Sequence, residues 1–200
     1  MKVLIACECS QTVCKEFRLL GHEAYSCDIE KCYGGYPKWH IQKDVLKILE
    51  YRSVSFFTQD GEGHTVDKWD LIIAHPPCTY LSNAATSKHS LKSTTLEEIN
   101  ERTAKRIQAQ EFFMQFTKAN CDKIAIENPV GVMSTVYRKP DQIIEPYQFA
   151  ESENDKENYQ TKRTCLWLKG LQPLKINDLP RPDIKAIHGT WSNGKARCWH

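Results

Sequence analysis

The sequence lacks a long apolar run and any segment typical of export. Across its 200 residues no uninterrupted stretch approaches the roughly 18 apolar residues that span a bilayer. The opening Met1 to Ile5 lacks the long apolar stretch and small-residue cleavage site of a signal peptide. We therefore expect a soluble, cytoplasmic protein with no membrane partner.

No two cysteines have the spacing typical of paired metal ligands, although cysteine is abundant. The chain holds nine cysteines, an odd number, and no Cys-x-x-Cys. Structural zinc sites use such pairs, and disulfide frameworks are typical of small secreted chains. We expect reduced thiols and no metal.

The positive and negative charges of the chain nearly balance, and the net charge is +2. The distribution is uneven, because residues 161–200 carry eight basic and two acidic side chains. Such a segment would suit phosphate groups, but charge alone is equally typical of an ordinary solvated surface.

Short apolar strands alternate with helices along the chain. The hydrophobic pattern predicts strands at residues 2–7, 24–27, 69–74 and 123–126, helices at 12–20, 45–51 and 96–118, and a hairpin within 53–65. This order favours one α/β domain with a doubly wound, Rossmann-like sheet, in which ligands bind beyond the carboxyl ends of the strands.

The long helix at 96–118 has a recognisable apolar stripe. Leu96, Ile99, Ile107 and Met114 fall on one side of it, whereas charged residues face away. We predict that this stripe is the core face of the helix.

Polar residues follow three of the predicted strands. Asp28 ends the second strand, His75-Pro76-Pro77-Cys78 follows the strand at 69–74, and Glu127-Asn128-Pro129 follows the strand at 123–126. Pro-Pro-Cys and Glu-Asn-Pro in this order resemble motifs of the cytosine-C5 DNA methyltransferases, especially short phage-type members. The resemblance covers about residues 1–175 as a methyltransferase-like domain, and it leaves a basic tail at 176–200 in place of a full target-recognition domain.

The resemblance implies roles for four catalytic residues. Cys78 would add to C6 of cytosine as a thiolate, Glu127 would protonate or hydrogen-bond N3, and Asn128 would hold the backbone near Cys78. Arg163, in a partial match to a Gln-x-Arg-x-Arg stretch, would hold the base or a phosphate; an ordinary surface arginine is the alternative. We expect His75 to be a packing or loop-forming residue.

The resemblance also implies S-adenosylmethionine as the methyl donor. Its contacts would come from Cys7 and Glu8 in the first loop, from Asp28 at the ribose, from Asp44 at the adenine, and from Pro76. Asp44 would equally serve as the N-cap of the following helix. The first loop departs from the family pattern, because it lacks the glycines that let a backbone approach the cofactor.

The implied partner is DNA, with single-stranded DNA as a favoured form, and a separate recognition subunit would compensate for the missing domain. If the chain is phage-encoded, the compartment would be the cytoplasm of a bacterial host. Two alternatives stay open: modification of a free pyrimidine nucleotide, and a non-catalytic nucleic-acid-binding relative of the fold.

Overall fold

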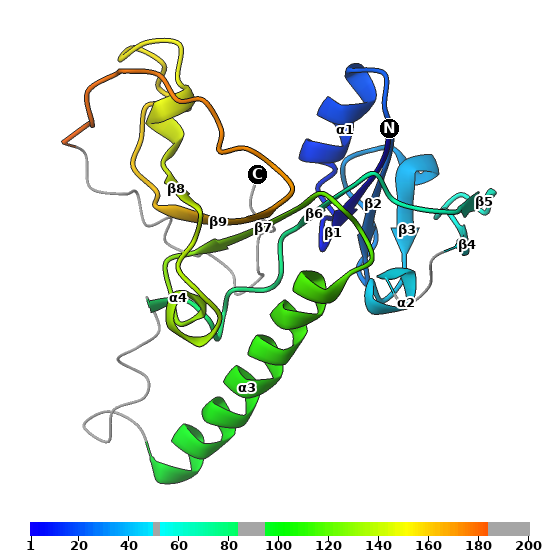
Figure 1. The fold of residues 1–200 in the computed structure, drawn as a ribbon, viewed down its shortest axis with the longest axis horizontal. Helices are drawn as coiled ribbons and strands as arrows, with labels where there is room; N and C mark the ends of the chain where they lie inside the picture. The colour runs from blue at the N-terminus through cyan, green and yellow to red at the C-terminus, as the bar shows by residue number, and fades with distance from the viewer. Residues whose placement is uncertain (50–52, 84–94, 184–200) are drawn as a thin grey trace.

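A mostly parallel, seven-stranded sheet forms the centre of the protein (Figure 1). The computed structural model describes residues 1–49, 53–83 and 95–183. Five strands run parallel in the order β3-β2-β1-β6-β7. Their bounds are β1 (Lys2–Ala6), β2 (Glu23–Asp28), β3 (His40–Gln42), β6 (Leu71–Ala74) and β7 (Ile124–Pro129). The predicted α/β class is confirmed, and the sheet is consistent with a Rossmann-like fold.

Two further strands extend the sheet beyond β7. The strand β9 (Thr164–Lys169) pairs antiparallel with β7, and β8 (Gln142–Ile144) pairs antiparallel with β9. Because β8 therefore runs in the same direction as β7, the loop at residues 145–163 lies beyond the carboxyl ends of the parallel strands.

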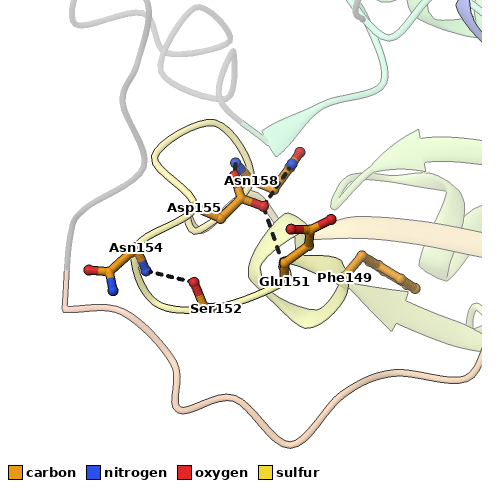
Figure 2. Close-up of a pocket in the computed structure, with 6 residues that line it drawn as sticks. All are labelled: Phe149, Glu151, Ser152, Asn154, Asp155 and Asn158. Atoms are coloured by element: carbon orange, nitrogen blue, oxygen red, sulfur yellow. Dashed lines mark hydrogen bonds between the residues drawn. The ribbon is translucent and has the colours of Figure 1, made fainter.

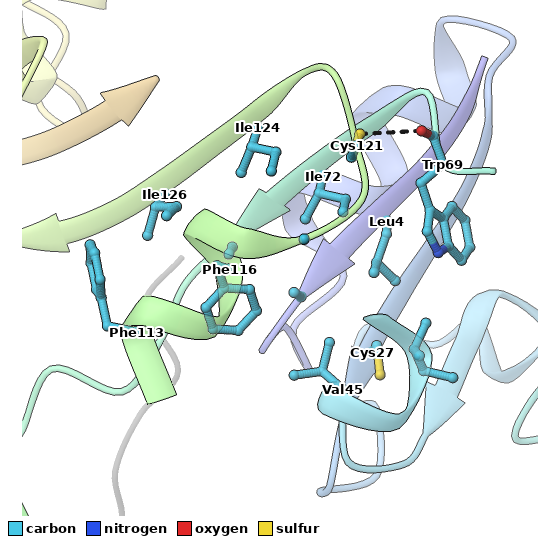
Figure 3. Close-up of a cluster of buried hydrophobic side chains, with 14 of the residues drawn as sticks. Leu4, Cys27, Val45, Trp69, Ile72, Phe113, Phe116, Cys121, Ile124 and Ile126 are labelled. Atoms are coloured by element: carbon cyan, nitrogen blue, oxygen red, sulfur yellow. Dashed lines mark hydrogen bonds between the residues drawn. The ribbon is translucent and has the colours of Figure 1, made fainter. Parts of the chain in front are cut away.

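Each face of the sheet has its own hydrophobic cluster. On one face α1 (Thr12–Leu19) contributes Cys14 to a cluster with Val3 and Ile5. On the other, Phe113 and Phe116 of α3 (Leu96–Lys118) pack in a cluster that includes Leu4 and strand residues of β6 and β7 (Figure 3). The alternation of side chains along β1 thus divides its apolar residues between two layers of helix.

The core face predicted for α3 is wrong. Leu96 is 64% exposed and Ile107 is 50% exposed, whereas the buried residues are Phe113 and Phe116 near the carboxyl end. A helix of 23 residues is about 35 Å long, but strands of four to six residues span only about 13–20 Å. The first half of α3 therefore extends past the sheet, as Figure 1 shows.

Smaller elements complete the fold. They are the 3-10 helices η1 (Pro37–Trp39) and η3 (Pro146–Phe149), the short helices α2 (Leu46–Leu49) and α4 (Met133–Val136), and a separate hairpin of β4 (Val54–Phe57) and β5 (Gly63–Val66). The hairpin confirms the prediction for 53–65. In the part of the chain that the structure describes, no helix is both long and apolar enough to cross a membrane.

Residues 171–183 contact the loop at 145–163 through an ion pair and hydrogen bonds. Arg181 forms a bidentate ion pair with the buried Glu145, with N–O distances of 2.7 and 2.9 Å. Asn177 donates its side-chain amide to the carbonyl of Ala150 at 2.8 Å. Part of the segment predicted to be a basic tail therefore packs against the domain.

Candidate active site

The strand ends that carry the two predicted motifs lie next to each other. Ala74 of β6 pairs with Ile126 of β7, so His75 leaves β6 beside Glu127. Glu127-Asn128-Pro129, predicted to follow the strand, instead forms the last three residues of β7 and pairs with β9. Asn128 is 1% exposed and donates from Nδ2 to the carbonyl oxygen of Pro76 at 2.7 Å. A buried side-chain amide thus connects Glu-Asn-Pro to Pro-Pro-Cys.

The loop that follows Cys78 is held from α3. The Cys78 carbonyl accepts the backbone N–H groups of Leu81 and Ser82 at 3.0 and 2.9 Å, which makes a tight turn. From α3, Arg102 donates to the Thr79 carbonyl at 3.3 Å and Arg106 to the Tyr80 carbonyl at 3.1 Å. The two guanidinium groups therefore bring positive charge to the turn that follows Cys78.

The other side of this loop is held by Gly131. The backbone N–H of Val132 donates to the Leu81 carbonyl at 2.9 Å, and Ser82 forms a β-bridge with Gly131. A Cβ atom at Gly131 would lie only 2.0 Å from the Leu81 oxygen. Only glycine permits this approach of the two backbones.

Gly131→Ala is therefore expected to displace the Cys78 loop and to destabilise the protein by about 1–3 kcal/mol, as overpacking against backbone does. Urea unfolding measures the change. Gly63→Ala in β5 is the matched control, because its Cβ would meet only the Phe57 ring, at 3.3 Å. Equal stability of the two variants would contradict the prediction.

A lysine that the sequence interpretation missed is close to both reactive groups. Lys162, just before β9, is partly buried, and this burial lowers the pKa of its ammonium group, while the charges of Glu127 and Cys78 act in the opposite direction. Arg163, which the motif alignment favoured, is exposed. The structure thus brings Lys162 together with Cys78 and Glu127.

His75 has a more specific contact than packing. Its Nδ1 lies 3.3 Å from Oε2 of Glu127, and both side chains are about a quarter exposed, at 28% and 27%. The residue immediately after β6 thereby meets the carboxylate on the neighbouring strand.

Four other thiols are unsuited to nucleophilic chemistry because they are buried. Burial raises the pKa of Cys14 to about 12, and it also raises the pKa values of Cys27, Cys121 and Cys165. Such groups stay protonated near neutral pH. Cys78 is partly exposed and sits beside Glu127 and Lys162.

The first loop achieves a glycine-like backbone without glycine. Cys7 and Gln11 adopt left-handed φ values of 60° and 62°, a conformation that costs a non-glycine residue roughly 1–2 kcal/mol. The Gln11 side chain offsets part of this cost, because it donates to the Tyr36 carbonyl at 2.8 Å and accepts the Tyr36 N–H at 3.0 Å. These two hydrogen bonds connect the first loop to the segment after β2.

Glu8 caps α1. The side chain is 5% exposed, and its carboxylate accepts the backbone N–H groups of Val13 and Cys14 at 2.7 and 3.2 Å. Burial raises the pKa of Glu8, whereas these bonds and the nearby His75 lower it. The helix terminus, a favoured anion site in many folds, is therefore already occupied by the protein's own carboxylate.

The two predicted cofactor acids differ in their surroundings. Asp28, partly exposed at the end of β2, accepts the Glu30 N–H at 2.9 Å through Oδ1. Asp44 is exposed, lies two residues before the start of α2, and accepts the Leu46 N–H at 3.0 Å through Oδ1. One of its oxygens is thus engaged by the first residue of that helix.

A polar pocket on the loop at 145–163 contains none of the predicted site residues (Figure 2). It is lined by Phe149, Glu151, Ser152, Asn154, Asp155 and Asn158. The Asp155 carboxylate is engaged within the loop, where it accepts hydrogen bonds from Glu151, Glu157 and Asn158. Among the described residues, no group of three or more His, Cys, Asp or Glu is placed to hold a metal.

In comparisons with protein families and with curated proteins, the chain matches no family model and no curated sequence. The functional assignment therefore depends on the geometry of the strand ends.

Proposed function

We propose that the protein transfers a methyl group from S-adenosylmethionine to C5 of cytosine, with DNA as the substrate. The observation that carries the proposal is the junction of the β6 and β7 ends. There the Asn128 side chain binds the Pro76 carbonyl at 2.7 Å, and Lys162 interacts electrostatically with Glu127 and with Cys78. A thiol, a carboxyl group and a cation at one point suit the addition of a nucleophile to a pyrimidine.

The chain's own residues would carry the proton and thiol steps. Cys78 Sγ forms a bond to C6 while Glu127 delivers a proton to N3, which makes C5 nucleophilic. After C5 is methylated, the C5 proton passes to solvent water, Cys78 leaves C6 as a thiolate, and N3 returns its proton to Glu127, which restores the aromatic ring and the enzyme. The ammonium group of Lys162 would place a positive charge near the thiol and so support the thiolate before addition.

The residues near β1 and β2 fit the adenosine part of the cofactor. One Asp28 oxygen is engaged by Glu30, and the other can accept a ribose hydroxyl. The left-handed Cys7 and Gln11 supply the turn that glycines give elsewhere. When bound, S-adenosylmethionine would supply an electrophilic methyl group on its sulfonium. Because Glu8 occupies the start of α1, the cofactor's carboxylate must be held by other groups.

The sheet order is compatible with this proposal. An antiparallel strand between β7 and β8 distinguishes it from an all-parallel doubly wound sheet and fits the methyltransferase fold. The basic side chains after residue 160 suit a phosphate backbone.

The decisive experiment is incubation with labelled S-adenosylmethionine and, in separate reactions, single-stranded DNA, duplex DNA and deoxycytidine monophosphate. Label recovered as 5-methylcytosine in DNA supports the proposal. Single strands should react faster, because extruding a base from a duplex costs a few kcal/mol. Reaction of the mononucleotide alone would move the assignment to nucleotide modification, and no product from any substrate would overturn it.

Lys162→Met is expected to lower the rate of methyl transfer by about 10- to 100-fold, because hydrogen bonds and close contacts of charged groups contribute about 1.5–3 kcal/mol. Arg163→Met should have a much smaller effect, since Arg163 is exposed. Lys47→Met, an exposed change on α2, controls for loss of charge. A larger loss of rate in Arg163→Met than in Lys162→Met would instead assign the role to Arg163, as the partial motif match does.

A further inference from the structure

His75 lies between the catalytic carboxyl group and the first loop. Its backbone N–H donates to the Ala6 carbonyl at 3.0 Å, which fixes the residue at the point where β1 and β6 end. From there its Nδ1 approaches Oε2 of Glu127 at 3.3 Å. On the β1 side it is close enough to Glu8 to interact with that carboxylate electrostatically. The proposed mechanism makes no use of this histidine.

The two ring nitrogens of His75 have different surroundings. Oε2 accepts a hydrogen bond both when the carboxyl group is ionised and when it carries its proton on Oε1, and Nδ1 then carries the hydrogen toward Glu127. In the described chain, Nε2 is buried and has no hydrogen-bond partner. The Nε2–H tautomer would bury an N–H group without an acceptor. The Nδ1–H tautomer leaves only a lone pair there, so the contacts favour the Nδ1–H tautomer.

We propose that His75 is a positioning residue for Glu127: its Nδ1–H fixes Oε2 and thereby presents Oε1 to N3 of the pyrimidine. The proposal rests on the proposed function, because it assigns a purpose to the orientation of Glu127. The ring itself exchanges no proton with substrate. Its task is to restrict the carboxyl group to one rotamer in a partly exposed position, where a carboxylate otherwise samples several.

Two isosteric substitutions separate this role from packing. The amide nitrogen of asparagine can occupy the place of Nδ1, whereas that of glutamine reaches the place of Nε2. His75→Asn should therefore keep kcat within about 3-fold of the unmodified protein, and His75→Gln should lower kcat by about 10- to 100-fold, the value of a hydrogen bond to a charged group. KM should change little, because Glu127 acts in the transition state. Unfolding midpoints of both variants show whether they are folded.

Nitrogen-15 NMR of the histidine rings tests the hydrogen bond without substrate. The resonances of His75 are those that disappear in His75→Asn. We expect the Nδ1–H tautomer in the unmodified protein. In Glu127→Ala we expect a shift toward the Nε2–H tautomer, which an isolated imidazole prefers. Cys78→Ser should leave the tautomer unchanged.

The outcomes distinguish this proposal from the proposed function. An Nε2–H or doubly protonated ring at neutral pH, or a tautomer that does not respond to Glu127→Ala, would overturn the role of His75 even in an active enzyme. Equal kcat values for His75→Asn and His75→Gln would do the same. An Nδ1–H ring in a protein without methyl transfer would overturn the proposed function, and with it the catalytic purpose of the contact.

Discussion

Cys78→Ser is expected to abolish methyl transfer, with a loss of at least about 10⁴-fold, because the reaction loses the nucleophile that activates C5. A serine hydroxyl is a much weaker nucleophile than a thiol, because its pKa is far higher. The fold should be retained, since Cys78 is partly exposed and its structural contacts include backbone bonds from Leu81 and Ser82. Initial rates with labelled cofactor measure the effect.

A trapping experiment identifies the nucleophile directly. DNA that contains 5-fluorocytosine should form a covalent complex with the unmodified protein, because fluorine cannot leave C5 as a proton does. Cys78→Ser should form none, and Cys32→Ser, which removes another partly exposed thiol, should trap normally. Trapping by the Cys78 variant would place the nucleophile elsewhere, with the partly exposed Cys7 as the next thiol to replace.

The sheet could be predicted from the sequence because its central strands are buried on both faces. Such strands appear as short apolar runs, and the runs at residues 2–7, 69–74 and 123–126 correspond to β1, β6 and β7. Helix positions were also predictable, but the core face of α3 was not. Periodicity shows which residues share a side of a helix, whereas burial depends on how far the sheet extends beneath it.

Within the site, motifs predicted which strands would meet but not which side chains would. The contact of His75 with Glu127 follows from the register of β6 and β7, and no residue pattern gives that register. Lys162 and Arg163 are neighbours in sequence, and neighbouring residues of an extended segment point to opposite sides. A partial motif match does not distinguish them, whereas the structure does, because Lys162 is partly buried and Arg163 is exposed.

The first loop shows that tertiary contacts can override the conformational preference of a residue. It lacks glycine, the residue that adopts left-handed conformations most readily. Cys7 and Gln11 nevertheless adopt left-handed conformations, and buried hydrogen bonds of Gln11 hold the loop in place. Local preference is a cost of about 1–2 kcal/mol per residue, which tertiary contacts can exceed.

Glu127→Gln is expected to lower kcat by about 10²- to 10⁴-fold, the usual contribution of a general acid. Glutamine has the size of glutamate and can still accept the His75 Nδ1–H, so the orientation of the side chain should persist. It cannot transfer a proton to N3, and the ring therefore stays resistant to addition at C6. Formation of the 5-fluorocytosine complex should slow in parallel, because the missing proton is needed before methyl transfer.

Glu111→Gln, on an exposed part of α3, removes a carboxylate without touching the strand ends and should leave the rate unchanged. If Glu127→Gln instead kept kcat within about 3-fold, N3 would receive its proton from another group, since a general acid contributes 10²-fold or more. Lys162 is the candidate, because its ammonium interacts with Glu127 and Cys78 and burial lowers its pKa, which makes it a stronger acid. The double variant of Glu127→Gln and Lys162→Met would then lose the activity that either single variant retains.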